Sequence, residues 1–167
     1  PPRSTLFPYT TLFRSEERVK DPLLTPVLEY VLDVSMTIGK MMMADIFHKF
    51  QGVTFIFAHY GGVLPFVKER FDNTYQMLRG RNFVKDLGAL PSDFFKNLYF
   101  DTSGSQSAAS LFCALEVVNA EHLFFGSDYP ANQKLSAAIA MIEHASLSQA
   151  DKEAILFKNA QKFILEK

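Results

Sequence analysis

The sequence predicts an α/β fold built on a parallel sheet. Three short apolar segments end in His59, Asp101 and Asp128, and helical patterns lie between them. Strands that alternate with helices are typical of parallel sheets with right-handed crossovers. In such folds the polar residues at the carboxyl ends of the strands usually carry the chemistry. The same three segments therefore indicate both the fold class and the place of a candidate site.

Composition restricts the class of protein. The chain has 167 residues, of which 48% are hydrophobic, and this favours one domain with a real core over a disordered chain. A formal net charge of −1 indicates no nucleic-acid or anionic-membrane partner. The single cysteine, Cys113, excludes an internal disulfide framework and fits a reducing compartment. No apolar run reaches the ~18 residues of a membrane span, so we expect a soluble, cytoplasmic protein.

Residues 1–15 do not read like the rest of the chain. Thr5-Leu6-Phe7 recurs as Thr11-Leu12-Phe13, and the block has neither helical nor strand periodicity. It resembles translated sequencing-adapter sequence, and a floppy natural terminus is the alternative. We therefore interpret residues 1–15 as an artefactual or disordered tail and residues 16–167 as the domain.

The first predicted helix covers residues 22–51. Thr25 followed by Pro26 is a helix-start pattern, with Thr25 as the N-cap. Hydrophobic residues then recur at helical spacing, and Gly39 is a candidate point at which the helix divides in two. A helix is thus expected to lead directly into the first strand.

The first strand is expected at Val53–Ala58. Its β-branched and aromatic residues are typical of a strand covered on both faces. His59 stands where the apolar run ends. Gly61 and Gly62 are expected to let the backbone turn sharply and approach whatever His59 faces.

The rest of the chain continues the alternation of helices and strands. Ser148 with Asp151 resembles a capping box for the last helix, which Asn159 is expected to interrupt. The expected helices are 62–79, a short turn beginning at 91, 106–119, 135–144 and 152–164, and the remaining strands are 97–102 and 123–126. Three strands make a poor sheet, and their exposed apolar edges predict association with other chains or aggregation.

Three motifs in a fixed order resemble the amidohydrolase-2 family, in particular its aminocarboxymuconate-semialdehyde, 6-methylsalicylate and resorcylate decarboxylases. The motifs are Phe57-Ala58-His59-Tyr60-Gly61-Gly62, Leu98-Tyr99-Phe100-Asp101-Thr102 and Leu123-Phe124-Phe125-Gly126-Ser127-Asp128-Tyr129-Pro130, followed by Asn159-Ala160 in the closing helix. The resemblance implies a metal-dependent (β/α)₈ TIM barrel, of which this chain is the carboxyl-terminal part with about three βα units. The family's His-x-His metal pair has no match among the four histidines of the chain.

The resemblance also assigns candidate roles to residues. It implies that Asp128 is a ligand of a divalent metal, expected to be Zn²⁺, and that His59 is a catalytic acid or base. It implies that Arg70 binds a substrate carboxylate, in some relatives across a homodimer interface. The bland alternatives are a helix-capping Asp128, a core His59 and a salt-bridged Arg70. Asp101 is expected to be structural, holding the end of its strand.

Two hypotheses of different classes follow. The first is a metal-dependent decarboxylase or hydrolase that acts on a small carboxylated or cyclic substrate, with no nucleic-acid or membrane partner. The second is a non-catalytic, truncated or degenerate domain that folds only by association. One His and one Asp do not make a zinc site, which needs three or more protein ligands, so the isolated chain is expected to be inactive.

Overall fold

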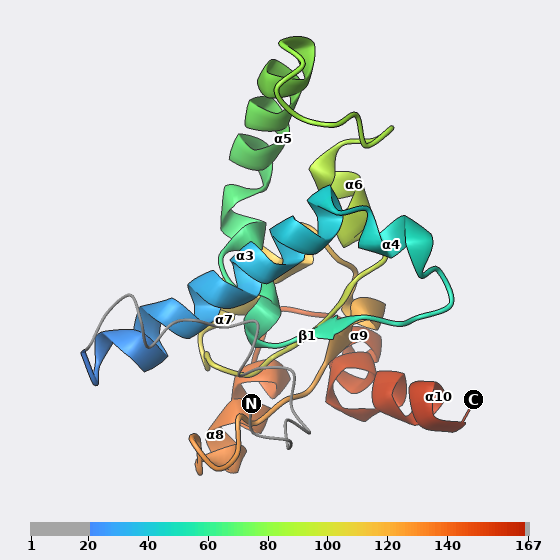
Figure 1. Cartoon of the computed structure of the whole chain (residues 1–167). Helices are drawn as coiled ribbons and strands as arrows, with labels where there is room; N and C mark the ends of the chain where they lie inside the picture. The colour runs from blue at the N-terminus through green and yellow to red at the C-terminus, as the bar shows by residue number, and fades with distance from the viewer. Residues whose placement is uncertain (1–20, 166–167) are drawn as a thin grey trace, which may run out of the picture.

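The computed structural model describes residues 21–165, and the predicted tail at 1–15 lies outside them. A small central sheet is surrounded by helices (Figure 1). In chain order the elements are η1 (Thr25–Glu29), α3 (Tyr30–Met43), α4 (Ile46–Lys49), β1 (Ile56–Phe57), η2 (His59–Gly61), α5 (Leu64–Gly80), α6 (Pro91–Phe95), β2 (Tyr99–Asp101), α7 (Ala108–Leu115), η3 (Ala120–His122), β3 (Leu123–Phe124), α8 (Leu135–Glu143), α9 (Gln149–Glu153), η4 (Ala154–Lys158) and α10 (Asn159–Leu165).

The three strands form one parallel sheet in the order β1-β2-β3, which confirms the predicted alternation. Phe57 pairs with Phe100 on β2, and Phe100 pairs in turn with Leu123 on β3. Phe100 and Leu123 are fully buried in the main hydrophobic core. The core therefore lies on the face of the sheet that these paired residues share.

The strands are shorter than the apolar segments that predicted them, and the expectation that both faces of the first strand are covered is wrong. Ile56 on β1 is 45% exposed and Val53 before it is 51% exposed. The reason is that strand side chains alternate between the two faces of a sheet, and Phe57 packs on the core whereas the face that carries Ile56 is only partly covered.

The start and the break of the first helix also differ from the sequence expectation. The N-cap of η1 is Leu24 rather than Thr25, and Asp21 accepts hydrogen bonds from the backbone N–H groups of Leu23 and Leu24. Gly39 lies inside α3, and the chain breaks instead at Asp45, which has a φ of 63°.

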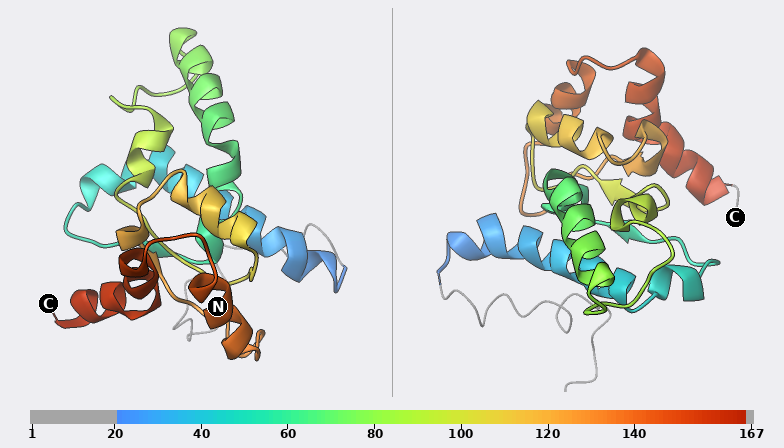
Figure 2. Two further views of the ribbon diagram at one scale, coloured as in Figure 1. Left: turned by 180° about the vertical axis from the view of Figure 1, so that it is seen from behind. Right: turned by 90° about the horizontal axis from the view of Figure 1, so that it is seen from above.

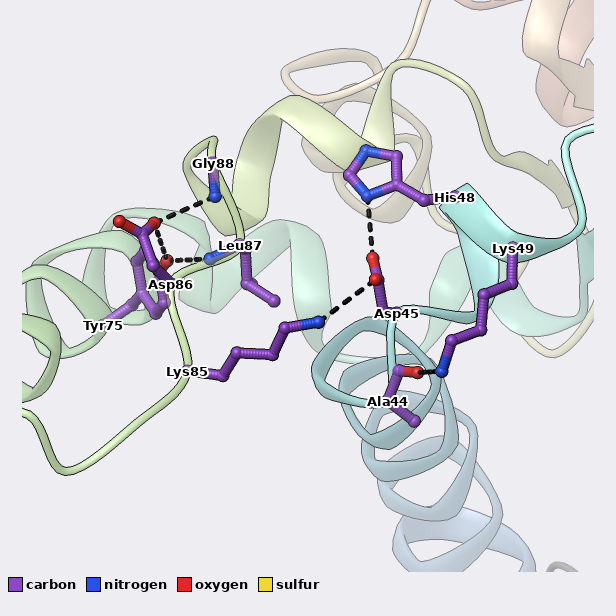
Figure 3. Close-up of polar contacts among 9 residues, drawn as sticks. All are labelled: Ala44, Asp45, His48, Lys49, Tyr75, Lys85, Asp86, Leu87 and Gly88. Carbon is purple, nitrogen blue, oxygen red and sulfur yellow. Dashed lines mark hydrogen bonds and ion pairs between the residues drawn. The ribbon is translucent and has the colours of Figure 1, made fainter.

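Figure 3 shows what holds this break. The Asp45 carboxylate contacts His48 Nδ1 at 2.7 Å and Lys85 Nζ at 3.1 Å. These contacts, with the His48 hydrogen bond as the largest cause, lower the pKa of Asp45. In the loop that contains Lys85, the N–H of Leu87 donates a hydrogen bond to the hydroxyl of Tyr75 on α5 at 2.7 Å. Side-chain bonds to a distant loop thus set the end of α3, which is why periodicity misplaced it.

Helix α5 runs outward from the sheet, and its carboxyl-terminal end projects from the body of the molecule (Figures 1 and 2). Helices α6, α7 and α8 confirm the expected helical segments, with Ser107 as the N-cap of α7. Ser148 caps α9 as expected, accepting a hydrogen bond from the N–H of Asp151 at 3.1 Å. Within residues 21–165, no helix has the length and apolar character needed to cross a membrane.

Candidate active site

The candidate site lies where the chain leaves β1. Only Ala58 separates His59 from the end of the strand, and His59 opens the short turn η2. Four successive residues, from His59 to Gly62, have φ between 55° and 76°. A left-handed conformation costs a non-glycine residue on the order of 1–3 kcal/mol, and such strain gathers at functional sites. The turn therefore needs strong local contacts to persist.

Those contacts come from the end of β2. The backbone N–H of His59 donates to Asp101 Oδ1 at 2.9 Å and lies 3.2 Å from Ser103 Oγ. Asp101 Oδ1 also accepts from the N–H of Ser103 at 3.0 Å and from the Ser103 hydroxyl. The ring of His59 contacts Ser103 Oγ through Nδ1 at 3.0 Å. Asp101 thus holds the strand end, as the sequence predicted, and it does so by binding the His59 turn.

Ser103 is the member of this cluster that sequence reasoning missed. Its side chain is only 6% exposed, and its hydroxyl joins Asp101 to the ring of His59. The available signal was Asp101-Thr102-Ser103-Gly104, a hydroxyl residue two positions after a strand-end carboxylate and just before a glycine.

The glycine pair turns sharply, as expected, but the neighbours that it approaches are not those of the His59 ring. A Cβ on Gly61 would lie 2.7 Å from the ring of Phe100, and one on Gly62 would lie 2.2 Å from the carbonyl oxygen of Val31. The turn is therefore packed between β2 and α3. The glycine that faces the His59 ring is Gly104, where a Cβ would meet Nδ1 at 2.5 Å.

Tyr60 anchors the turn from inside the core. It is 4% exposed, and burial, followed by the negative charge of Asp101, raises the pKa of its hydroxyl well above the ordinary value. A weak contact with Thr102 offsets part of this rise, but no bond of normal geometry satisfies the hydroxyl. Tyr60 therefore stays neutral and acts as a hydrophobic anchor for the strained turn.

Asp128 follows β3, on the same side of the sheet at which β1 and β2 end. Its φ is 62°, and its carbonyl oxygen accepts a hydrogen bond from the N–H of Asn132 at 2.9 Å. Among the described residues, no hydrogen bond or ion pair joins its carboxylate to His59 or Asp101. The structure thus brings the ends of the three strands to one edge but leaves the Asp128 side chain without a bonded partner there.

Arg70 lies on α5, away from these strand ends. It is exposed and lines an apolar groove of about 770 Å³ between α3 and α5, together with Met36, Val67 and Phe71. Neither His59 nor Asp128 lines this groove. Arg70 is therefore presented to the outside of the protomer rather than to the His59 cluster.

The remaining histidines have local partners or lie at the surface. His48 binds Asp45, and His122 Nδ1 contacts the carbonyl oxygen of Leu98 at 3.0 Å while its ring stacks on Tyr99. Within residues 21–165, no three His, Cys, Asp or Glu side chains are grouped so as to hold a metal ion. The described residues do not fit a complete metal centre, because a zinc site takes at least three protein ligands.

Comparison with known proteins places these features in a family. The sequence model described as Amidohydrolase matches residues 30–164. The chain is 25% identical over 150 residues to gamma-resorcylate decarboxylase of Polaromonas sp. (strain JS666), covering 88% of this chain and 46% of that protein. It is 26% identical over 132 residues to Decarboxylase orsB of Emericella nidulans, covering 77% and 39%. The chain thus spans less than half the length of the curated relatives it matches.

Solved structures give the same result for the fold. 5-Carboxyvanillate decarboxylase LigW from Sphingomonas paucimobilis matches with a TM-score of 0.73 and 25% identity, over 80% of this chain and 40% of that one. A dihydroxybenzoic acid decarboxylase from Polaromonas sp. JS666, solved with manganese and the inhibitor 2-nitroresorcinol, matches with a TM-score of 0.73 and 24% identity, over 99% and 49%. The expected fold, part of an amidohydrolase barrel, is confirmed. With its family match extending from the first turn of α3 to the end of α10, the chain belongs to the amidohydrolase family.

Proposed function

We propose that the complete protein is a metal-dependent decarboxylase that acts on a small carboxylated aromatic or cyclic substrate. The observation that carries this proposal is the fixed position of His59 at the carboxyl end of β1, held through its backbone by Asp101 and through its ring by Ser103. Both curated relatives reported above are decarboxylases, which favours decarboxylation over the hydrolysis of an ester, lactone or amide.

His59 suits the proton step of this reaction. Loss of carbon dioxide from a carboxylate replaces the carbon–carbon bond with a carbon–hydrogen bond, so one proton must be delivered to the substrate carbon. An imidazole is the side chain best suited to hold and release a proton near neutral pH. We assign to His59 the role of the acid or base that handles this proton.

We propose Asp128 as one ligand of the metal, with zinc as the first candidate. The support is that Asp128, half-buried in the loop after β3, makes no hydrogen bond or ion pair through its carboxylate within residues 21–165, so its oxygens are free to bind a cation. The related dihydroxybenzoic acid decarboxylase holds manganese, which makes manganese the second candidate. Because residues 21–165 hold no group of three such ligands, at least one further ligand has to come from outside them.

Arg70 is proposed as the residue that binds the substrate carboxylate, in a homodimer. Its side chain lines the outer groove between α3 and α5, away from the His59 cluster, so this proposal places the site that it reaches in a second protomer. Arginine suits this role because its planar fork binds a carboxylate through two hydrogen bonds. An Arg70→Lys variant of the complete protein should raise KM much more than it lowers kcat.

The test of the function uses the complete protein. Asp128→Ala should remove bound metal and activity together, and His59→Gln should abolish activity while metal stays bound. Glu69→Gln, an exposed position on α5, is the matched control and should change neither property. Retention of metal and activity in Asp128→Ala would reject the assignment.

A second candidate is a non-catalytic domain that folds only by association. It is favoured by the absence of a three-ligand cluster in residues 21–165 and by the half-exposed Ile56 at the outer edge of the sheet. Zinc titration of the purified 167-residue chain tests this candidate, and tight binding of one zinc ion per chain would argue against it. No binding is expected from both candidates, because the enzyme would also need ligands from outside residues 21–165.

A further inference from the structure

The cluster of His59, Asp101 and Ser103 determines where the hydrogen atoms lie. Asp101 Oδ1 accepts two backbone N–H groups, those of His59 and Ser103, so this oxygen is an acceptor. The Ser103 hydroxyl contacts the same oxygen, and a hydroxyl has a single hydrogen. That hydrogen must point to Asp101, because otherwise the lone pairs of two oxygens would face each other across a short contact.

The remaining capacity of Ser103 is then only to accept. Two lone pairs are left on Oγ. One faces the backbone N–H of His59 at 3.2 Å, and the other faces the ring Nδ1 of His59 at 3.0 Å. A ring nitrogen that meets a lone pair at this distance has to carry the hydrogen. All three hydrogen-bonding positions of the Ser103 hydroxyl are thus used, and the direction of each bond is fixed.

We propose that Ser103 is a positioning residue that holds neutral His59 in the tautomer with its hydrogen on Nδ1. The lone pair is then on Nε2, which makes no hydrogen bond with any residue in 21–165. Nε2 becomes the nitrogen that accepts or returns a proton. The tautomer stands on the geometry alone, whereas its importance for turnover rests on the proposed decarboxylase function.

The surroundings leave little room for another arrangement. Gly104 has a φ of 78°, and a Cβ there would lie 2.5 Å from His59 Nδ1. A Cβ on Gly126 would lie 3.0 Å from Asp101 Cγ. Ser103 itself is buried, so water does not compete freely for its hydroxyl. The hydroxyl, the carboxylate and the imidazole are therefore held in one geometry before any substrate binds.

Nitrogen-15 NMR of the 167-residue chain, labelled at its histidines, tests the proposal without metal or substrate. His59, assigned by its loss in His59→Gln, should show the tautomer with the hydrogen on Nδ1. His122 is an internal reference for the same tautomer and for folding, because its Nδ1 faces a carbonyl oxygen that only accepts. A signal from His59 with the hydrogen on Nε2, or an equal mixture of tautomers, would overturn the proposal.

Variants of Ser103 separate positioning from packing. Ser103→Ala should move His59 towards the Nε2–H tautomer while His122 stays unchanged, and Ser103→Thr should restore the original tautomer. Ser105→Ala is the matched control, since the Ser105 hydroxyl bonds Ser110 and not His59. An unchanged His59 tautomer in Ser103→Ala would overturn the proposal even if the variant were less stable.

The activity of the complete enzyme gives an independent readout. Ser103→Ala should lower kcat about tenfold or more with little change in KM, and Ser103→Thr should recover most of it. If the proposed function is wrong, the Asp128→Ala variant will keep its metal and activity. The NMR result on the His59 tautomer would not be affected by that outcome. Failure of the present proposal would appear in the His59 spectrum whatever substrate the enzyme uses.

Discussion

The two outer strands of the sheet, β1 and β3, differ in whether their outer edges are covered by other parts of the chain. The outer edge of β3 is covered: the N–H of Phe125 donates to the carbonyl oxygen of Ile155 at 2.9 Å, and Asn159 Nδ2 donates to that of Leu123 at 2.7 Å. The outer edge of β1 is open. By the alternation of a parallel ladder, the N–H and C=O of Ile56 point away from β2, and neither makes a hydrogen bond with another residue in 21–165.

At the carboxyl ends of the same two strands the order is reversed: the end of β1 is held by other residues, and the loop after β3 is exposed. The end of β1 is held in a strained turn by Asp101 and Ser103, whereas the loop after β3 includes Tyr129, which is 79% exposed. The edge of β3 thus supplies stability, and the end of β1 supplies a preorganised side chain. Within residues 21–165, the outer edge of β1 is thus left open, and the carboxylate of Asp128 makes no hydrogen bond or ion pair.

The largest effect is expected from removing the cover of β3. Ile155 is 1% exposed, and Ile155→Ala should lower the free energy of unfolding by about 2–5 kcal/mol, since it deletes buried apolar contacts and leaves a cavity. Ile164→Ala, at a position 71% exposed on α10, should change it by about 0.5 kcal/mol or less. Urea unfolding followed by circular dichroism measures both, and equal losses would mean that η4 does not cover the sheet.

A smaller loss is expected at Asn159. Its amide donates to the carbonyl oxygens of Ala120 and Leu123 at 2.8 and 2.7 Å. Asn159→Ala should cost about 2 kcal/mol because two carbonyls lose their donor. Asn159→Asp should cost more, since a carboxylate cannot donate to a carbonyl. Gln161→Ala, at an exposed position on the same helix, is the control. An Asn159→Asp variant as stable as the wild type would show that the Asn159 amide does not hold these carbonyl groups.

The sequence predicts those parts of this comparison that depend on local pattern. The order of strands and helices follows from hydrophobic periodicity, and His59 is found at a strand end because the apolar run stops there. The role of Asp101 as a brace is also predictable, since a carboxylate at a buried strand end needs donors.

The remaining features depend on contacts between distant parts of the chain. Ser103 meets the ring of His59 across 44 positions, and Asn159 meets Leu123 across 36. The end of α3 at Asp45 depends on Lys85, which is 40 positions away. A pattern read in one short stretch of sequence cannot contain such pairs. The contact of Asn159 with β3, the contact of Ser103 with His59 and the break after α3 are therefore seen only in the structure.

Alkaline pH should probe the turn at the end of β1. The pKa of Tyr60 is raised in the folded state above its ordinary value of 10.0, so its contribution to stability is complete below pH 10 and is lost as the pH rises beyond it. The free energy of unfolding should fall by about 1.4 kcal/mol per pH unit there through this group. Tyr60→Phe should remove this part of the slope, whereas Tyr129→Phe, at an exposed position, should keep it. Identical slopes in the two variants would show that Tyr60 ionises freely and that the turn is loosely packed.

The smallest change in stability, and a clear change in association, is expected at the open edge of β1. Ile56→Lys places a charge on an edge whose backbone groups are unpaired, and charged residues on edge strands oppose pairing with other chains. The free energy of unfolding should change by about 0.5 kcal/mol or less, because Ile56 is half exposed. Sedimentation velocity should show less self-association than in the wild type. Met77→Lys, 49% exposed on α5, is the matched control because it adds the same charge far from the edge. If Met77→Lys reduced self-association equally well, net charge rather than the open strand would govern association. The proposal that chains associate through the edge of β1 would then be wrong.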